Sequence, residues 1–164
     1  MIRSTRRFLS AFAAAAALAC AAQAAETLGM NEQPIHDAAR LGTRAAVERI
    51  LKATPAARDA RTPLGSTPLH MAALNVDSGP LQALIAAGAD INARDREGAT
   101  PLHMAAYATR TEHARLLLQA GADVTVKTEN GRDALSMARK VRADETAGII
   151  SLWILKGCKP GKPC

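Results

Sequence analysis

Aromatic side chains are scarce in this chain. Its 164 residues include one Trp, one Tyr and two Phe. Aromatic residues supply much of the buried area in ordinary cores and interfaces. Without them, the core must be built mainly from Ala and Leu, and any binding surface must be largely polar.

Long hydrophobic segments are also few. The two most apolar stretches are residues 8–19, about a dozen residues, and Ile149–Leu155, seven residues. A membrane-spanning helix needs about 20, so we expect no membrane span. We expect the second stretch, which includes Trp153, to close the end of the fold; the alternative is a docking surface for a partner.

The motifs of common active sites are missing as well. The chain has no G-x-S-x-G turn, no glycine-rich phosphate loop and no His-x-x-x-His pair. Acidic residues such as Asp95 and Glu97 lie in turn-rich segments, where helix caps and solvated charges are the ordinary explanation. We expect no enzymatic activity, no cofactor and no metal site.

Charge of one sign does not dominate. The 21 basic and 15 acidic residues give a net charge of +6. Loss of Arg3, Arg6 and Arg7 with a leader would leave 18 basic residues against the same 15 acidic ones. Nucleic-acid binding requires a clustered basic face, whereas here both signs alternate. We expect no nucleic-acid partner.

A seven-residue word, T-P-L-H-M-A-A, occurs twice in the chain. Its copies at Thr67–Ala73 and Thr100–Ala106 start 33 residues apart. Degraded copies lie 33 residues later, at Asp133–Ala138, and 34 residues before Pro68–Ala73, at Pro34–Ala39. A fixed period of this length is the signature of stacked supersecondary units. We expect four units, at about 31–64, 65–97, 98–130 and 131–157.

Each unit reads as two helices followed by a turn-rich segment. Thr-Pro favours a helix start, because Thr caps and Pro fits the first helical position. A second helix follows, with apolar residues at helical spacing. Gly88 and Gly121 are expected to end it, and the polar stretch Asp90–Gly98 to form a projecting finger.

The repeated word and its period resemble the ankyrin repeat. The resemblance implies an all-α solenoid of about four helix-turn-helix units with short β-turn fingers. It also implies that His70 and His103 are structural, each bonding the Thr of its own motif (Thr67 and Thr100) and the neighbouring finger. His36 occupies the same slot, but Gln33 replaces the Thr there. His113 lies outside these slots, and we expect it to be exposed.

The resemblance further implies protein–protein binding through the finger tips and the exposed side of the first helices. Tyr107 and the arginines are the best candidates, because Tyr and Arg are enriched at binding hot spots. The alternative is that these residues are simply solvated. The candidates for partner binding are Arg40, Leu74, Asn75, Arg94, Arg96, Glu97, Tyr107, Glu129, Asn130, Arg132 and Lys140, with Leu41, Leu64 and Ser66 in equivalent slots.

The N-terminus has the features of a secretory signal peptide. A basic start precedes the apolar stretch, and Ala22-Gln23-Ala24 resembles a cleavage site. We expect residues 1–24 to be removed and residues 25–157 to form the repeat domain. The alternative is lipid attachment at Cys20, although Leu18 stands two residues before it rather than three.

Cleavage would leave two cysteines, Cys158 and Cys164, in a Pro- and Gly-rich tail (158–164). In an oxidising compartment they can close a small disulfide loop; the alternative is two free thiols. We therefore expect a monomeric protein-binding scaffold in the periplasm of a Gram-negative cell. Two more specific alternatives are a factor that protects against or shields a periplasmic toxin or enzyme, and a secreted host-directed effector.

Overall fold

The computed structural model describes residues 33–160. The predicted cleavage site and Cys20 lie outside this range, as does Cys164. Within it the chain is helical, with no strand. The elements are α2 (Pro34–Leu41), α3 (Arg44–Ala53), the 3-10 helix η1 (Pro55–Asp59), α4 (Pro68–Ala72), α5 (Gly79–Ala86), α6 (Pro101–Tyr107), α7 (Thr111–Gln119), α8 (Ala134–Lys140) and α9 (Asp144–Lys156).

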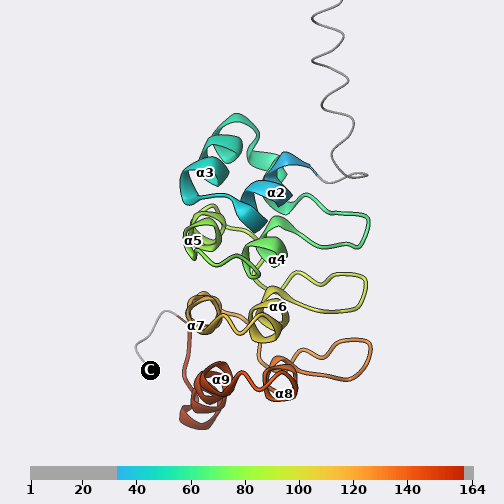
Figure 1. The fold of residues 1–164 in the computed structure, drawn as a ribbon, viewed down its shortest axis with the longest axis vertical. Coiled ribbons are helices and arrows are strands. Elements are labelled where there is room, and N and C mark those ends of the chain that lie inside the picture. The colour runs from blue at the N-terminus through green and yellow to red at the C-terminus, as the bar shows by residue number, and fades with distance from the viewer. Residues whose placement is uncertain (1–32, 161–164) are drawn as a thin grey trace, which may run out of the picture. The chain divides into compact units, whose positions relative to one another are not determined.

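The helices stack in two parallel rows (Figure 1). The inner helices α2, α4, α6 and α8 form one row, and the outer helices α3, α5, α7 and α9 form the other. Three loops, residues 60–67, 87–100 and 120–133, project to one side from the inner row; we call them fingers. The all-α solenoid expected from the repeat is confirmed.

The core lies between the two rows. Leu is the commonest residue among its largest fully buried side chains, which include Leu69 of the second unit and Leu102 and Leu117 of the third. Buried Ala residues such as Ala72 and Ala105 fill the remaining positions, and their small size lets neighbouring helices approach closely. The core therefore has the Ala and Leu composition that the scarcity of aromatics predicts.

Helix boundaries follow the local sequence. Proline stands at the first turn of α4 and α6, directly after the cap residues Thr67 and Thr100. Gly88 and Gly121 follow the outer helices with φ of +77° and +105°. Glycine adopts this left-handed region at least cost, so these residues turn the chain out of the helix and into the next finger.

The last helix closes the stack with one of its faces. Ile150 of α9 is fully buried and Trp153 is partly buried against the core. Leu152, Ile154 and Leu155 are exposed, Leu155 by 83%. Only part of the apolar stretch Ile149–Leu155 therefore covers the end of the stack, as predicted for the whole stretch. None of the described helices is long and apolar enough to cross a membrane.

Candidate partner-binding site

A buried histidine links each of the inner helices α2, α4 and α6 to the next finger. The Thr67 amide donates to Nδ1 of His70 (3.1 Å), and the Thr67 hydroxyl oxygen lies 2.9 Å from the same nitrogen. Nε2 of His70 lies 3.0 Å from the carbonyl oxygen of Ala99. Because Nδ1 accepts an amide proton, the neutral ring carries its proton on Nε2 and donates it to Ala99. One ring therefore joins two units.

The same arrangement recurs in the third unit. Nδ1 of His103 accepts from the Thr100 amide (3.2 Å), and Nε2 lies 3.1 Å from the carbonyl oxygen of Arg132. Burial lowers the pKa of both His70 and His103, since the charged ring would lose its hydration. Both rings are therefore held neutral, as these hydrogen bonds require.

The first unit keeps this link although its cap residue is different. The backbone amide of Gln33 donates to Nδ1 of His36 at 3.2 Å, and Nε2 lies 3.1 Å from the carbonyl oxygen of Ala60. The acceptor Ala60 lies at the start of the first finger, whereas Ala99 and Arg132 lie at the ends of their fingers, directly before the next inner helix and its cap. The bond to Nδ1 needs only a backbone amide, so Gln33 can replace Thr.

The expectation that His113 is exposed is wrong. Only 3% of His113 is accessible, and its Nε2 lies 3.3 Å from the carbonyl oxygen of Asp77 in the preceding unit. Burial lowers its pKa as well. Because α7 begins at Thr111, its third residue faces the loop of the unit before it. His113 is therefore a further link between units.

Asn75 and Ser66 were also placed wrongly. Asn75 is 4% exposed, and its side-chain amide donates to the carbonyl oxygens of Ala39 (2.9 Å) and Gly42 (3.1 Å). These carbonyls stand at the end of α2, where no further helical amide reaches them. Ser66 is buried at the base of its finger. Neither residue is available to a partner.

The fingers are held together by side chains at the repeat spacing. Arg61 Nη1 donates to the carbonyl oxygen of Arg94 (2.7 Å), and Arg94 Nη2 donates to that of Lys127 (2.9 Å). The guanidinium of Arg94 also lies 3.6 Å from the Glu129 carboxylate. Arg94 and Glu129, both predicted to bind a partner, therefore already interact with each other and align neighbouring fingers.

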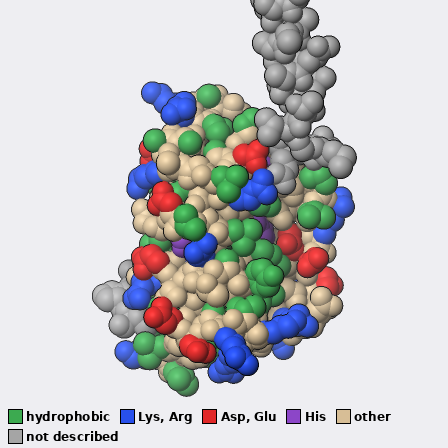
Figure 2. Space-filling model, viewed as in Figure 1, with side chains coloured by type: hydrophobic (Ala, Val, Ile, Leu, Met, Phe, Trp, Pro, Cys, Tyr) green, Lys and Arg blue, Asp and Glu red, His purple; other side chains and the backbone are tan. Residues whose placement is uncertain are grey.

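Five of the predicted binding residues meet in one groove between the third and fourth units. The groove has a volume of about 280 Å³ and lies between α6, α8 and the fingers that precede them. Tyr107 at its wall is 60% exposed. Figure 2 shows apolar side chains gathered over the inner row where it meets the fingers, with basic side chains near its lower end. The five residues are Glu97, Tyr107, Asn130, Arg132 and Lys140.

The remaining candidates do not line this groove. Arg40 is exposed and pairs with Asp37 at 2.9 Å. Arg96 is exposed on the second finger, and Leu74 is partly buried on the inner row.

The sequence interpretation missed the methionines of the repeated word. Met71, Met104 and Met137 stand 33 residues apart and are partly buried. Met104 and Met137 line the groove beside Val141. The signal was the M of T-P-L-H-M-A-A, to which the sequence interpretation gave no role of its own. In the structure, this position lies at the edge of the core and faces the groove.

The groove contains no candidate for metal chemistry. Within residues 33–160, no three His, Cys, Asp or Glu side chains come together as a possible ion site. The histidines at the repeat spacing are bonded to backbone atoms of successive fingers. The groove is a concave surface. Met104, Met137 and Val141 form its apolar floor, and Glu97, Arg132 and Lys140 form its charged rim.

Paired helices, projecting fingers and histidine links between units define an α-helical repeat protein. A family model described as ankyrin repeats (3 copies) matches residues 35–128 and, overlapping these, residues 76–147. The matches span well over half of the chain, which belongs to the ankyrin-repeat family. The comparison with curated proteins gave no match. Ankyrin repeats are generally binding scaffolds without catalytic function.

Proposed function

We propose that this protein is an exported scaffold that holds a partner protein in the groove between its third and fourth units. The observation that carries the proposal is Tyr107. It is the one Tyr of the chain, it lies 60% exposed on an inner helix, and it stands beside a concave pocket. Exposed aromatic residues at apolar pockets with polar rims are typical of binding hot spots.

Export rests on the N-terminal sequence. The basic start, the short apolar stretch and the Ala22-Gln23-Ala24 site support cleavage after Ala24 and release into the periplasm. In that oxidising compartment, we propose that Cys158 pairs with Cys164. Mass spectrometry of the mature protein with and without reductant, after alkylation, tests both the cleavage site and the disulfide.

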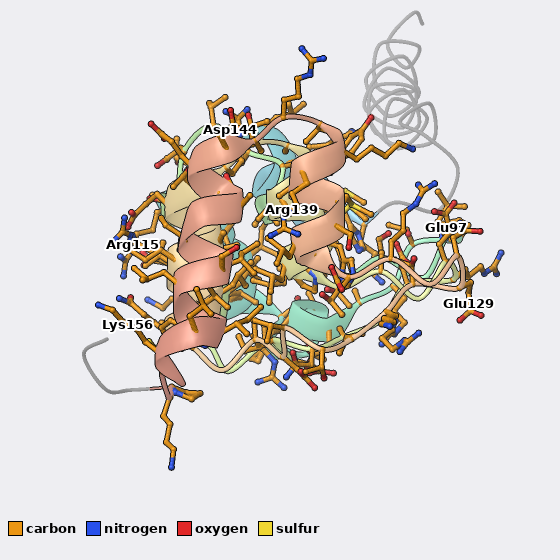
Figure 3. The ribbon with its side chains drawn as sticks, turned by 90° about the horizontal axis from the view of Figure 1, so that it is seen from below. Glu97, Arg115, Glu129, Arg139, Asp144 and Lys156 are labelled. Carbon is orange, nitrogen blue, oxygen red and sulfur yellow. The ribbon has the colours of Figure 1, made fainter. Side chains whose placement is uncertain are left out.

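Copurification from the periplasm tests the binding function. The full chain, with its own leader and a C-terminal tag, is expressed in its native cell and recovered from the periplasmic fraction. We expect a stoichiometric protein partner to copurify with the wild type and with Arg115→Ala, because Arg115 lies on the outer row away from the fingers (Figure 3). Tyr107→Ala should lose the partner.

Two results would contradict this proposal. One is the absence of a stoichiometric partner under several growth conditions. The other is equal recovery of the partner with Tyr107→Ala and with Arg115→Ala, which would place the contact outside the groove. Recovery of the chain in the culture medium alone would instead favour the secreted effector.

A further inference from the structure

We infer that the groove recognises an acidic protein segment that carries a bulky apolar side chain. The apolar side chain would enter the pocket, and neighbouring carboxylates would meet Arg132 and Lys140 on the rim. This inference rests on the proposed function and adds the chemistry of the partner to it.

The size and lining of the pocket indicate that the segment carries one bulky apolar side chain. A volume of about 280 Å³ lies just below the range of small-molecule pockets, about 300–1,000 Å³. It suits one bulky side chain of a larger partner. Met104, Met137 and Val141 supply apolar surface, with Tyr107 beside them. Methionine side chains are flexible and polarisable, so they can adapt to branched or aromatic guests.

The positive charges on the rim of the groove indicate that the bound segment is acidic. Arg132 and Lys140 are exposed, and neither has a carboxylate within salt-bridge distance among residues 33–160. Glu97 is the one acidic side chain in the lining of the groove. The ion pairs in this part of the chain lie elsewhere: Arg40–Asp37, Arg44–Glu48, Arg58–Asp59, Arg94–Glu129 and Arg115–Glu112.

The dipole of α8 accounts for the positive charge at Lys140 but not for the one at Arg132. Lys140 ends α8, where the helix dipole favours positive charge. Arg132 comes two residues before the first residue of α8, near the end that favours negative charge. Its charge therefore gains nothing from its own helix. A partner carboxylate would supply the missing counter-charge.

The backbone of Arg132 is held firmly before any partner arrives. Its carbonyl oxygen accepts from Nε2 of His103 (3.1 Å) and from the Thr128 amide (2.9 Å). Its own amide lies 3.3 Å from the Thr128 hydroxyl oxygen. A residue fixed in this way loses less conformational freedom on binding, which improves affinity. The histidine link thus positions one cation of the rim.

Other occupants of the groove fit the charges less well. The C-terminal tail carries Lys159 and Lys162, and the leader carries three Arg, so both have the same sign as the rim. A second copy could offer residues 65–97, which hold four acidic and two basic side chains. Self-association through the groove is therefore an outcome that the test must detect.

Peptide selection on the purified mature chain tests the inference. The probe is a phage-displayed library of random 12-residue peptides. We expect enriched peptides to combine several Asp or Glu with one large apolar residue. As synthetic peptides they should bind the Arg132→Glu, Lys140→Glu double variant at least tenfold more weakly than the wild type. The matched control Arg115→Glu should bind like the wild type. Thermal melts followed by circular dichroism check that each variant is folded.

A milder pair of variants keeps the test decisive if the double charge reversal fails to fold. Arg132→Gln and Lys140→Gln remove the charges with little change in size. Each should weaken binding several-fold and reduce the dependence of the affinity on salt concentration. Sedimentation of the wild type at the same concentrations should show a monomer.

Four results would overturn the inference. They are selection of basic or neutral peptides, equal binding to the wild type and the charge variants, no enrichment at all, and a dimer that Lys140→Glu dissociates. The copurification experiment answers a different question. A partner lost with Tyr107→Ala but unaffected by the charge variants would keep the proposed function and contradict the acidic segment.

Discussion

Nε2 of His103 lies 3.1 Å from the carbonyl oxygen of Arg132. This contact joins the third unit to the base of the following finger, and that finger base carries a cation of the groove. The buried histidine belongs to the fold, whereas the exposed guanidinium of Arg132 is free to meet a partner. Stability therefore depends on the backbone of Arg132 and binding on its side chain, so different variants can test the two.

Loss of the histidine link should weaken the fold. His103→Ala leaves the Thr100 amide without its side-chain acceptor and removes the bond to the Arg132 carbonyl oxygen. Each such loss costs about 1–2 kcal/mol, so we expect a clear fall in Tm, measured by circular dichroism. Arg115→Ala, on the exposed surface, is the control. An unchanged Tm in His103→Ala would mean that these bonds contribute little.

Acid should lower stability through the three buried histidines whose pKa is lowered. Burial lowers the folded-state pKa of His70, His103 and His113 below the ordinary value of about 6.5. Below that pH the unfolded chain binds more protons than the folded chain, so the free energy of unfolding falls as the pH falls. It is at its full value above about pH 6.5. We expect a lower Tm at pH 5.0 than at pH 7.5.

Asp123 and Asp133 contribute to stability in a lower pH range than the histidines. Hydrogen bonds from Thr125 and Ser136 lower the pKa of Asp123 and Asp133 respectively, so their contributions are lost only below about pH 4. His113→Gln keeps a donor for the Asp77 carbonyl oxygen but does not titrate. It should reduce the fall in Tm between pH 7.5 and 5.0. A Tm that rises on acidification would contradict the assignment.

Asn75→Ala should destabilise the protein although Asn75 occupies a binding slot of the repeat. The change removes the donor to the carbonyl oxygens of Ala39 and Gly42, which are then left without it beside the helix end. We expect a loss of about 1–3 kcal/mol in urea unfolding. Val76→Ala changes a neighbour that is 80% exposed and should shift stability by about 0.5 kcal/mol or less. Equal effects would show that Asn75 is not a link between units.

Tyr107→Ala should affect partner binding and not stability. Its side chain is 60% exposed at the groove wall, so its removal should leave Tm nearly unchanged while it abolishes partner binding. Thermal melting and copurification on the same preparation give both readings. If Tyr107→Ala unfolds the chain, the assignment of the exposed face of α6 is wrong.

The repetitive features of this molecule could be predicted from the sequence. The 33-residue period, the Thr-Pro starts and the glycine ends are local signals, and they determine the helix pairs and the direction of the fingers. The same period placed Tyr107, Arg132 and Lys140 on one face, because equivalent positions in stacked units point the same way. The groove combines such positions from two adjacent units.

The exceptions depend on the turns between the inner and outer helices, which do not follow the period as the fingers do. Asn75 and His113 lie at or just beyond the turn between the inner and outer helices, where the sequence differs from unit to unit. The direction of a side chain there depends on the residue at which the outer helix begins. The methionines were missed for another reason: a partly buried position at the edge of the core contributes both to packing and to a surface.

Site-specific photo-crosslinking tests the central claim most directly. A photoreactive amino acid replaces Tyr107 in one strain and Arg115 in another, with the leader intact, and living cells are irradiated. We expect a discrete adduct with one partner protein from position 107 and none from position 115, which lies on the outer row (Figure 3). Equal adducts from both positions, or none from position 107, would contradict binding in the groove.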